Sequence, residues 1–288
     1  MPGRRGPGIT SFLRTLIGPV GSAEAGRTVP TSGRSAAPNR VNASRMWPFA
    51  IYYGWPSYIN GAHSKVARAI SAFDGYRMVV FGDDTATPDG DPLAAPIMAG
   101  VAARGGVPYG YVTVGAADGE PNHSLGELRE RLDAWRRLGA RGVLLDCAGA
   151  DYGVTRARFD AVVRYTHSLG LSVLANAWNP DDVLARSLTM GPGDGYLGEN
   201  DVLSDGQFLS PATYKPKLAK MAAYKAKLGI TLYETATSYD LQHADALTPQ
   251  VMAALQGYNI DAFHLTDPIY SCSDNVLIRP PAGLADGQ

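Results

Sequence analysis

The chain has 288 residues, of which 45% are hydrophobic and 18% charged, and its formal net charge is −1. This length suits one (β/α)8 barrel of about 250 residues as well as two smaller domains. The near-zero charge argues against nucleic acid or an acidic membrane surface as a partner, and no segment has the roughly 20 consecutive apolar residues of a membrane-spanning helix. The two cysteines, Cys147 and Cys272, form neither a disulfide framework nor a metal-ligand spacing.

Residues 1–45 differ in composition from the rest of the chain. They are rich in Gly, Pro, Ser, Ala and Arg and contain almost no aromatic residues, so they cannot build a core of their own. We expect an N-terminal arm that is disordered or becomes ordered against a protein partner in a larger assembly. Arg14 interrupts the apolar stretch 9–20, so a signal peptide is only weakly indicated and the location of the protein stays open.

From Met46 onward, short β-rich runs alternate with amphipathic helical stretches. The eight runs are Phe49–Gly54, Arg77–Gly82, Pro108–Gly115, Gly142–Cys147, Ser172–Ala177, Gly195–Glu199, Ile230–Thr235 and Ala262–Asp267. Several runs are continuously apolar, which is typical of parallel strands covered on both faces. We therefore predict an α/β fold, a (β/α)8 TIM barrel, over residues 46–288. An open doubly wound sheet is less favoured, because no glycine fingerprint follows the first run.

The predicted helices carry start and stop signals. Ser124 and Glu127 form a capping-box pattern before one helix, and Thr155 precedes the next, which Gly170 ends. Three further helices are expected to start at an N-cap residue followed by proline, and Gly229 is expected to end the second of these. The pairs are Asn179-Pro180, Ser210-Pro211 and Thr248-Pro249.

In a barrel of this type the functional side chains stand at the C-terminal ends of the strands. The residues that we place there are polar or aromatic, and the candidate site comprises Tyr53, Trp55, Asp83, Tyr111, Asp146, Asn176, Trp178, Glu199, Glu234 and His264. Aromatic faces stack on sugar rings, and carboxylates transfer protons at the anomeric centre. The combination predicts a glycoside hydrolase with a polysaccharide substrate.

Asp146 and Glu199 are the predicted catalytic pair. Asp146 follows the apolar run 142–145, so desolvation should raise its pKa, as a general acid requires. Glu199 lies two strands further along, and Glu234 competes with it for the same role. Asp146 could instead cap a helix, and Glu199 could simply end a strand. The spacing of the two carboxyls, which separates retention from inversion, does not follow from the sequence.

The remaining polar residues offer weaker alternatives. Asn176 could bind a sugar hydroxyl or acetamido group, or could be a satisfied structural amide. The acidic cluster 83–91 lacks the spacing of a calcium loop and is interpreted as turn residues. The histidines and cysteines match no metal or nucleophile motif, and no strand ends in a Schiff-base lysine, so we expect no metal and no cofactor.

Two segments resemble known barrel families. The segment Gly139-Ala140-Arg141-Gly142-Val143-Leu144-Leu145-Asp146 and the strand Leu171–Asn176 resemble the middle of the endo-α-1,4-polygalactosaminidases (glycoside hydrolase family 114) and the spherulin-4-like hydrolases (family 135). The opening Tyr52-Tyr53-Gly54-Trp55-Pro56 and the strand 109–112 are similar to the spherulin-like members. The resemblance implies metal-free hydrolysis of α-1,4-linked galactosamine polymers, with acidic roles for Asp146 and Glu199 and a substrate-binding role for Asn176.

Two functional hypotheses therefore remain. The first is a glycosidase that cleaves an amino-sugar exopolysaccharide. The second is a non-catalytic carbohydrate-binding or structural barrel in a larger assembly, such as a phage or virion tail, and the 45-residue arm motivates it.

Overall fold

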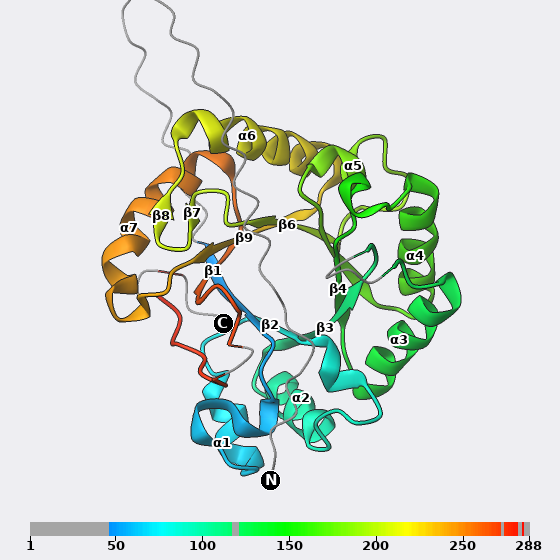
Figure 1. The fold of residues 1–288 in the computed structure, drawn as a ribbon, viewed down its shortest axis with the longest axis vertical. Helices are drawn as coiled ribbons and strands as arrows, with labels where there is room; N and C mark the ends of the chain where they lie inside the picture. The colour runs from blue at the N-terminus through cyan, green and yellow to red at the C-terminus, as the bar shows by residue number, and fades with distance from the viewer. Residues whose placement is uncertain (1–45, 117–120, 272–273, 282–283, 285–288) are drawn as a thin grey trace, which may run out of the picture.

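The computed structural model describes residues 46–116, 121–271, 274–281 and 284. The predicted arm, residues 1–45, lies outside the described residues. Eight parallel strands close into a barrel in the order β1-β10-β9-β6-β5-β4-β3-β2, and helices surround the ring of strands (Figure 1). The predicted (β/α)8 barrel is confirmed.

The barrel strands are short, as expected for strands that are buried on both faces. They are β1 (Trp47–Tyr52), β2 (Met78–Phe81), β3 (Val107–Thr113), β4 (Gly142–Asp146), β5 (Ser172–Asn176), β6 (Gly195–Glu199), β9 (Thr231–Thr237) and β10 (Ala262–Thr266). A small antiparallel hairpin of β7 (Leu203–Ser204) and β8 (Gln207–Phe208) follows β6. β9 therefore extends two residues beyond its predicted end at Thr235.

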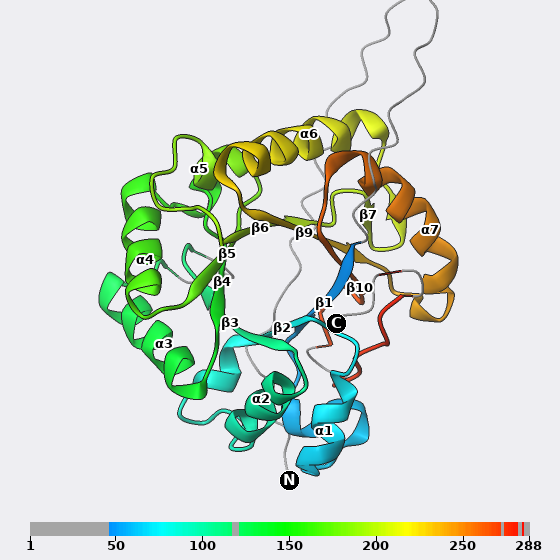
Figure 2. The ribbon, with the colours of Figure 1, turned by 180° about the vertical axis from the view of Figure 1, so that it is seen from behind.

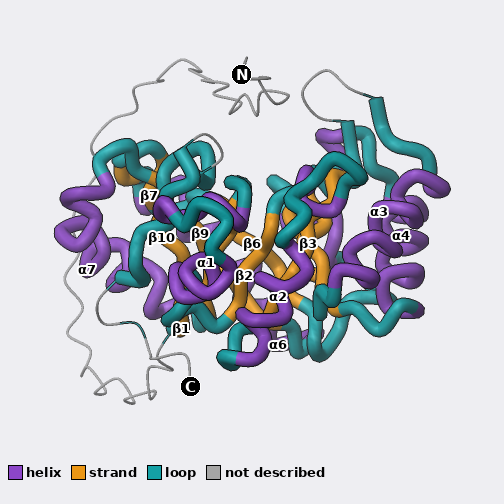
Figure 3. The backbone as a smooth tube through the Cα atoms, turned by 90° about the horizontal axis from the view of Figure 1, so that it is seen from below, coloured by secondary structure: helices purple, strands orange, loops and turns teal. Residues whose placement is uncertain are grey.

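The outer layer consists of helices that follow the strands in chain order around the barrel (Figure 2). They are α1 (Val66–Ala72), α2 (Ala94–Ala103), α3 (Leu125–Leu138), α4 (Arg156–Ser168), α5 (Pro180–Leu184), α6 (Pro211–Leu228) and α7 (Ala244–Leu255), with 3-10 turns at Pro56–Gly61, Asp83–Ala86, Ala150–Tyr152, Leu241–His243 and Gln256–Tyr258. Seen side-on, the strands run through the middle of the molecule between these helices (Figure 3). Of the helices described, none combines the length and the apolar character needed to cross a membrane.

Most of the predicted helix ends are observed. Ser124 and Glu127 make the reciprocal capping box of α3, and the side chains of Asn179 and Ser210 cap α5 and α6. Gly229 ends α6 in the left-handed conformation with φ 71°. The prediction for Thr248-Pro249 is wrong, because α7 starts one turn earlier, at Ala244, and Pro249 lies inside the helix.

Glycines on the barrel strands make room for large rings from neighbouring strands. A Cβ on Gly142 would stand 2.3 Å from the ring of Tyr109, and one on Gly195 would stand 2.5 Å from the ring of Tyr233. On the outer face, a Cβ on Gly110 would stand 2.1 Å from the indole of Trp135 in α3. The lower interior and the helix layer are thus close-packed, which leaves the C-terminal mouth as the place for polar side chains.

Candidate active site

Three polar side chains reach the mouth of the barrel from consecutive strands. Asp146 ends β4, Asn176 ends β5 and Glu199 ends β6. The inward positions of these strands are occupied below them by Leu144, Leu174 and Leu197, which belong to one apolar cluster inside the barrel. Because side chains alternate along a strand, the next inward position of each strand is the polar one. The structure thus brings together the three residues that the sequence singles out most strongly.

Asp146 is held as a hydrogen-bond acceptor. The hydroxyl of Tyr111 donates to its Oδ2 at 2.6 Å, and the backbone N–H of Cys147 donates to its Oδ1 at 2.8 Å. Cys147 has φ 51°, a conformation that non-glycine residues rarely adopt, where the chain turns sharply after β4. Two donors of this kind favour the ionised form of the carboxylate.

Glu199, two strands away on β6, is held by two other donors. The side-chain amide of Asn176 donates to Oε2 at 3.3 Å, and the hydroxyl of Tyr270, in the loop after β10, donates to Oε1 at 2.9 Å. Desolvation raises the pKa of Glu199 to about 7, and the nearby charge of Asp146 contributes in the same direction. The hydrogen bond from Tyr270 lowers that pKa only in part. At neutral pH the carboxyl therefore carries a proton in a substantial share of molecules.

Three tyrosine rings pack against one another next to the two carboxyls. The ring centroid of Tyr53 lies 5.1 Å from that of Tyr111 and 5.3 Å from that of Tyr270. Burial raises the phenol pKa of all three far above its ordinary value, so the hydroxyls remain neutral donors. One ring thus connects the tyrosine that holds Asp146 with the tyrosine that holds Glu199.

Two tryptophans lie at the rim. Trp178, two residues after Asn176, is 71% exposed, and Trp55 is 42% exposed. The ammonium of Lys217 in α6 lies 5.2 Å from the centre of the Trp178 ring. An exposed indole beside polar side chains is suited to stacking on a sugar ring. The candidate Asp83 begins the 3-10 turn Asp83–Ala86, and its side chain lies outside the described part of the structure.

The placement of Glu234 at the mouth is wrong. β9 runs on to Thr237, so Glu234 lies in the middle of the strand, in register with Gly198. Its fully buried side chain points outward between barrel and helices, where Oε1 accepts the N–H of Asp201 at 2.9 Å. The neighbouring Thr235 lies on the inner face of β9, and its hydroxyl lies 3.3 Å from that of Tyr270.

His264 does not line the mouth either. It is fully buried, and its Nδ1 accepts the N–H of Ile51 at 3.2 Å. The observed pairing of β1 with β10 covers only their first residues, Trp47↔Ala262 and Pro48↔Phe263. The imidazole therefore satisfies a backbone donor of β1 beyond that pairing. Burial lowers its pKa to about 3, so the imidazole is neutral at physiological pH.

Sequence reasoning missed Tyr270 and Thr235. Tyr270 lies beyond the last strand, in a loop where Asp267 accepts the N–H groups of Ile269 and Ser271 at 2.9 Å each. Tyr270 and Ser271 both have positive φ. The Asp-Pro pair at 267–268 signals a turn, but nothing in the sequence shows that the turn folds back over the barrel.

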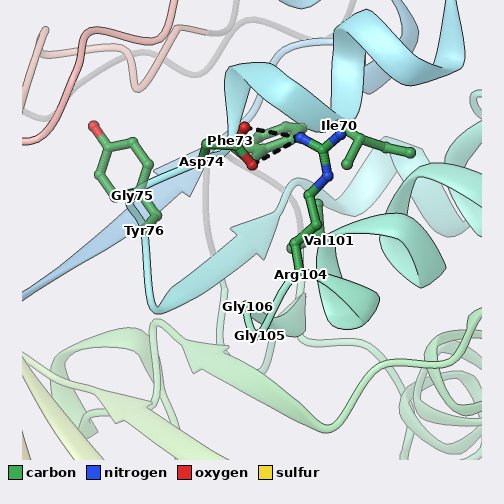
Figure 4. Close-up of a pocket in the computed structure, with 9 residues that line it drawn as sticks. All are labelled: Ile70, Phe73, Asp74, Gly75, Tyr76, Val101, Arg104, Gly105 and Gly106. Atoms are coloured by element: carbon green, nitrogen blue, oxygen red, sulfur yellow. Dashed lines mark hydrogen bonds and ion pairs between the residues drawn. The ribbon is translucent and has the colours of Figure 1, made fainter. Parts of the chain in front are cut away.

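A separate hollow of about 50 Å³ lies at the opposite end of the barrel (Figure 4). It is lined by residues that precede β2 and β3, including Gly75 and Gly106, and its one ion pair joins Arg104 to Asp74 at 2.8 Å. It shares no residue with the mouth. Among the residues that the structure describes, no three metal-ligating side chains are gathered together.

Comparison with known proteins identifies the fold. No known family's sequence model and no curated protein matches the chain. The carboxyl transferase domain of Rhizobium etli pyruvate carboxylase is similar over 78% of this chain and 40% of its own, with a TM-score of 0.50 and 12% identity. An exo-beta-1,4-mannosidase from Opitutaceae bacterium strain TAV5 covers 78% of this chain and 54% of its own, at a TM-score of 0.45 and 14% identity.

A D-psicose 3-epimerase covers 73% of this chain and 82% of its own, at a TM-score of 0.40 and 8% identity. The chain spans about a quarter to about half of the length of the first structures that it matches. At these identities a likeness bears on the fold alone, and the (β/α)8 barrel itself is shown by the observed order of the strands.

Proposed function

We propose that the protein is a glycoside hydrolase in which Glu199 and Asp146 act as the pair of carboxyl groups. The observation that carries the proposal is their shared position at the mouth. Each carboxyl accepts a hydrogen bond from a tyrosine hydroxyl, and the charge of Asp146 helps to raise the pKa of Glu199 to about 7. Two acids whose surroundings favour opposite protonation states are what glycoside hydrolysis requires.

The environments assign the roles in the reverse of the sequence-based expectation. Glu199, desolvated and partly protonated at neutral pH, is the general acid that protonates the leaving oxygen. Asp146 accepts two hydrogen bonds, which favour its carboxylate form, and in this proposal it is the group that faces the anomeric carbon. It acts either as the nucleophile or as the base that activates water. The anomeric configuration of the first product, followed by NMR, decides between the two.

Other residues would bind and orient the sugar. The exposed indole of Trp178 offers a stacking face, and the amide of Asn176 offers a donor beside Glu199. We propose an amino-sugar exopolysaccharide of the α-1,4-galactosaminide type as substrate. The resemblance of the β4 and β5 segments to families 114 and 135 supports this, as does a mouth rich in carboxylate and hydroxyl acceptors for ammonium and hydroxyl groups.

The test is an assay of reducing ends. The protein and the variants Asp146→Asn and Glu199→Gln are incubated with a galactosaminogalactan-type polymer, and bound polymer is measured in parallel. Release by the unsubstituted protein alone supports the proposal. Binding without release by any of the three would instead support the second hypothesis, a non-catalytic carbohydrate-binding barrel.

A further inference from the structure

A second pair of carboxyl groups lies directly behind Glu199, on the outer side of the barrel wall. Asp201 is 6% exposed and Glu234 is fully buried. They are joined at one edge, where the N–H of Asp201 donates to Glu234 Oε1 at 2.9 Å. Lys217 of α6 donates to Asp201 Oδ1 at 2.7 Å.

The other oxygen of each carboxyl has no donor. Glu234 Oε2 and Asp201 Oδ2 are both buried without a hydrogen-bond partner. Both oxygens lie against Gly198, because a Cβ there would stand 2.2 Å from the first and 2.8 Å from the second. The methyl group of Met221 closes the same space, so it is not open to solvent. Two ionised oxygens facing each other here would repel strongly.

We propose that Glu234 and Asp201 share one proton and that this pair, neutralised by Lys217, positions Glu199 at the mouth. With one proton on Glu234, its hydroxyl donates to Asp201 Oδ2, and both orphan oxygens are satisfied. The one remaining negative charge balances the ammonium of Lys217. The other titratable groups that face the pair are Glu199, across β6, and Tyr196, whose hydroxyl donates to Ala177 O at 2.6 Å.

The pair controls the turn that follows Glu199. Asn200, with φ 56°, donates its N–H to the carbonyl oxygen of Thr235 at 3.2 Å, and the N–H of Asp201 is fixed on Glu234. Both residues after Glu199 are therefore fastened to β9. Through Lys217, the same cluster reaches the ring of Trp178. The positioning role rests on the proposed function, whereas the shared proton does not.

The shared proton is tested without substrate. In protein labelled with 13C at the glutamate side-chain carboxyl carbons, the Glu234 resonance, assigned by its loss in Glu234→Gln, is followed with pH. A protonated shift that persists at pH 7 is expected. Burial and Asp201 raise the pKa of Glu234 in the folded chain. At pH values above the pKa of the unfolded chain, the folded state therefore keeps a proton on Glu234 that the unfolded state has lost. Stability is then lost with increasing pH, and Glu234→Gln, whose amide replaces the acid hydroxyl, escapes that loss.

The unfolding equilibrium constants of the original protein and of Glu234→Gln should therefore diverge by up to about tenfold per pH unit above pH 5. Parallel pH dependences, or an ionised Glu234 resonance at pH 7, would overturn the shared proton. Once assigned with a folded Glu234→Gln variant, the resonance decides the question without any measurement of stability.

The positioning role has its own readout. Glu234→Gln should leave the titration midpoint of Glu199 near 7, because every hydrogen bond to the turn is kept. Glu234→Leu releases the N–H of Asp201, so Glu199 gains contact with water and its midpoint should fall. If hydrolysis occurs, kcat should fall for Glu234→Leu and be restored in Glu234→Gln. Equal midpoints in both variants would refute positioning, whereas absence of hydrolysis with the expected midpoints would refute only the hydrolase.

Discussion

The hydroxyl of Tyr270 donates a 2.9 Å hydrogen bond to Oε1 of Glu199 from a loop 71 residues away in the chain. The same hydroxyl lies 3.3 Å from that of Thr235 on β9. The general acid proposed here is thus held by the C-terminal loop as well as by its own strand. This contact makes Tyr270 a determinant of the protonation of Glu199.

Tyr270→Phe removes a hydrogen bond that favours the ionised form of Glu199. We expect the Glu199 pKa to rise further above 7 and kcat to fall about 10- to 100-fold, because the acid loses its orientation. A pH–rate profile measures both effects. Tyr233→Phe, in the lower interior of the barrel, is the control and should leave the profile in place. A Tyr270→Phe profile that matches the original one would show that the contact has no role in catalysis.

Glu199→Gln should abolish activity and stabilise the fold at alkaline pH. The folded-state pKa of about 7 lies above the ordinary value of 4.5, so the folded chain binds more protons between these limits and loses stability as pH rises through about 7. The variant escapes that loss, and we expect a gain of about 1–3 kcal/mol at pH 8 that vanishes near pH 4.

Chemical denaturation at the two pH values measures the gain. Glu127→Gln is a control of opposite sign, because the capping box lowers the Glu127 pKa and the stability it contributes is present at high pH. A Glu199→Gln variant that is less stable than the original protein at pH 8 would contradict the assigned environment.

Trp178→Ala should weaken substrate binding more than chemistry. The exposed indole follows Asn176 by two residues and contacts Lys217, so in the proposed site we expect KM to rise about tenfold with kcat little changed. Leu188→Ala is the matched control: Leu188 is 96% exposed, but it lies in the segment that leads into the N-terminal end of β6. If both variants keep the original KM, Trp178 is not a binding face.

Gly110→Ala should destabilise the barrel by about 1–3 kcal/mol, because its Cβ would overlap the fully buried indole of Trp135. Gly126→Ala, in the same α3 helix as Trp135, has nothing closer than 3.6 Å to the new Cβ and should gain about 0.5–1 kcal/mol. Thermal unfolding of the two variants compares them directly. Equal stabilities would refute the close packing of α3 on β3.

The barrel was predictable because each strand can be recognised from its local sequence. Val143, Leu144 and Leu145 make both faces of β4 apolar, and the capping box of Ser124 and Glu127 marks the start of α3. The same local rule delivers Asp146, Asn176 and Glu199 to one edge, since each is the first polar side chain after an apolar inward position.

The errors arise where a long-range choice decides the outcome. The sequence places Glu234 near the end of its strand, but β9 continues for three more residues. Glu234 is therefore paired within the strand, and its carboxyl lies on the outer face. The buried ring of His264 accepts a hydrogen bond from the N–H of Ile51 on β1, which is 213 residues away in the chain. Tyr270 reaches the mouth only because of the path of the last loop. None of these relationships has a signal within a few residues of the side chain concerned.

In the proposed site Asp146 and Glu199 act on each other at the mouth of the barrel. The most direct test is a 13C NMR titration of the Glu199 carboxyl in the original protein and in Asp146→Asn. We expect a midpoint near 7 in the first and a clearly lower one in the second, because the negative charge that opposes ionisation of Glu199 is gone. The same midpoint in both proteins would mean that the two carboxyls do not share a site.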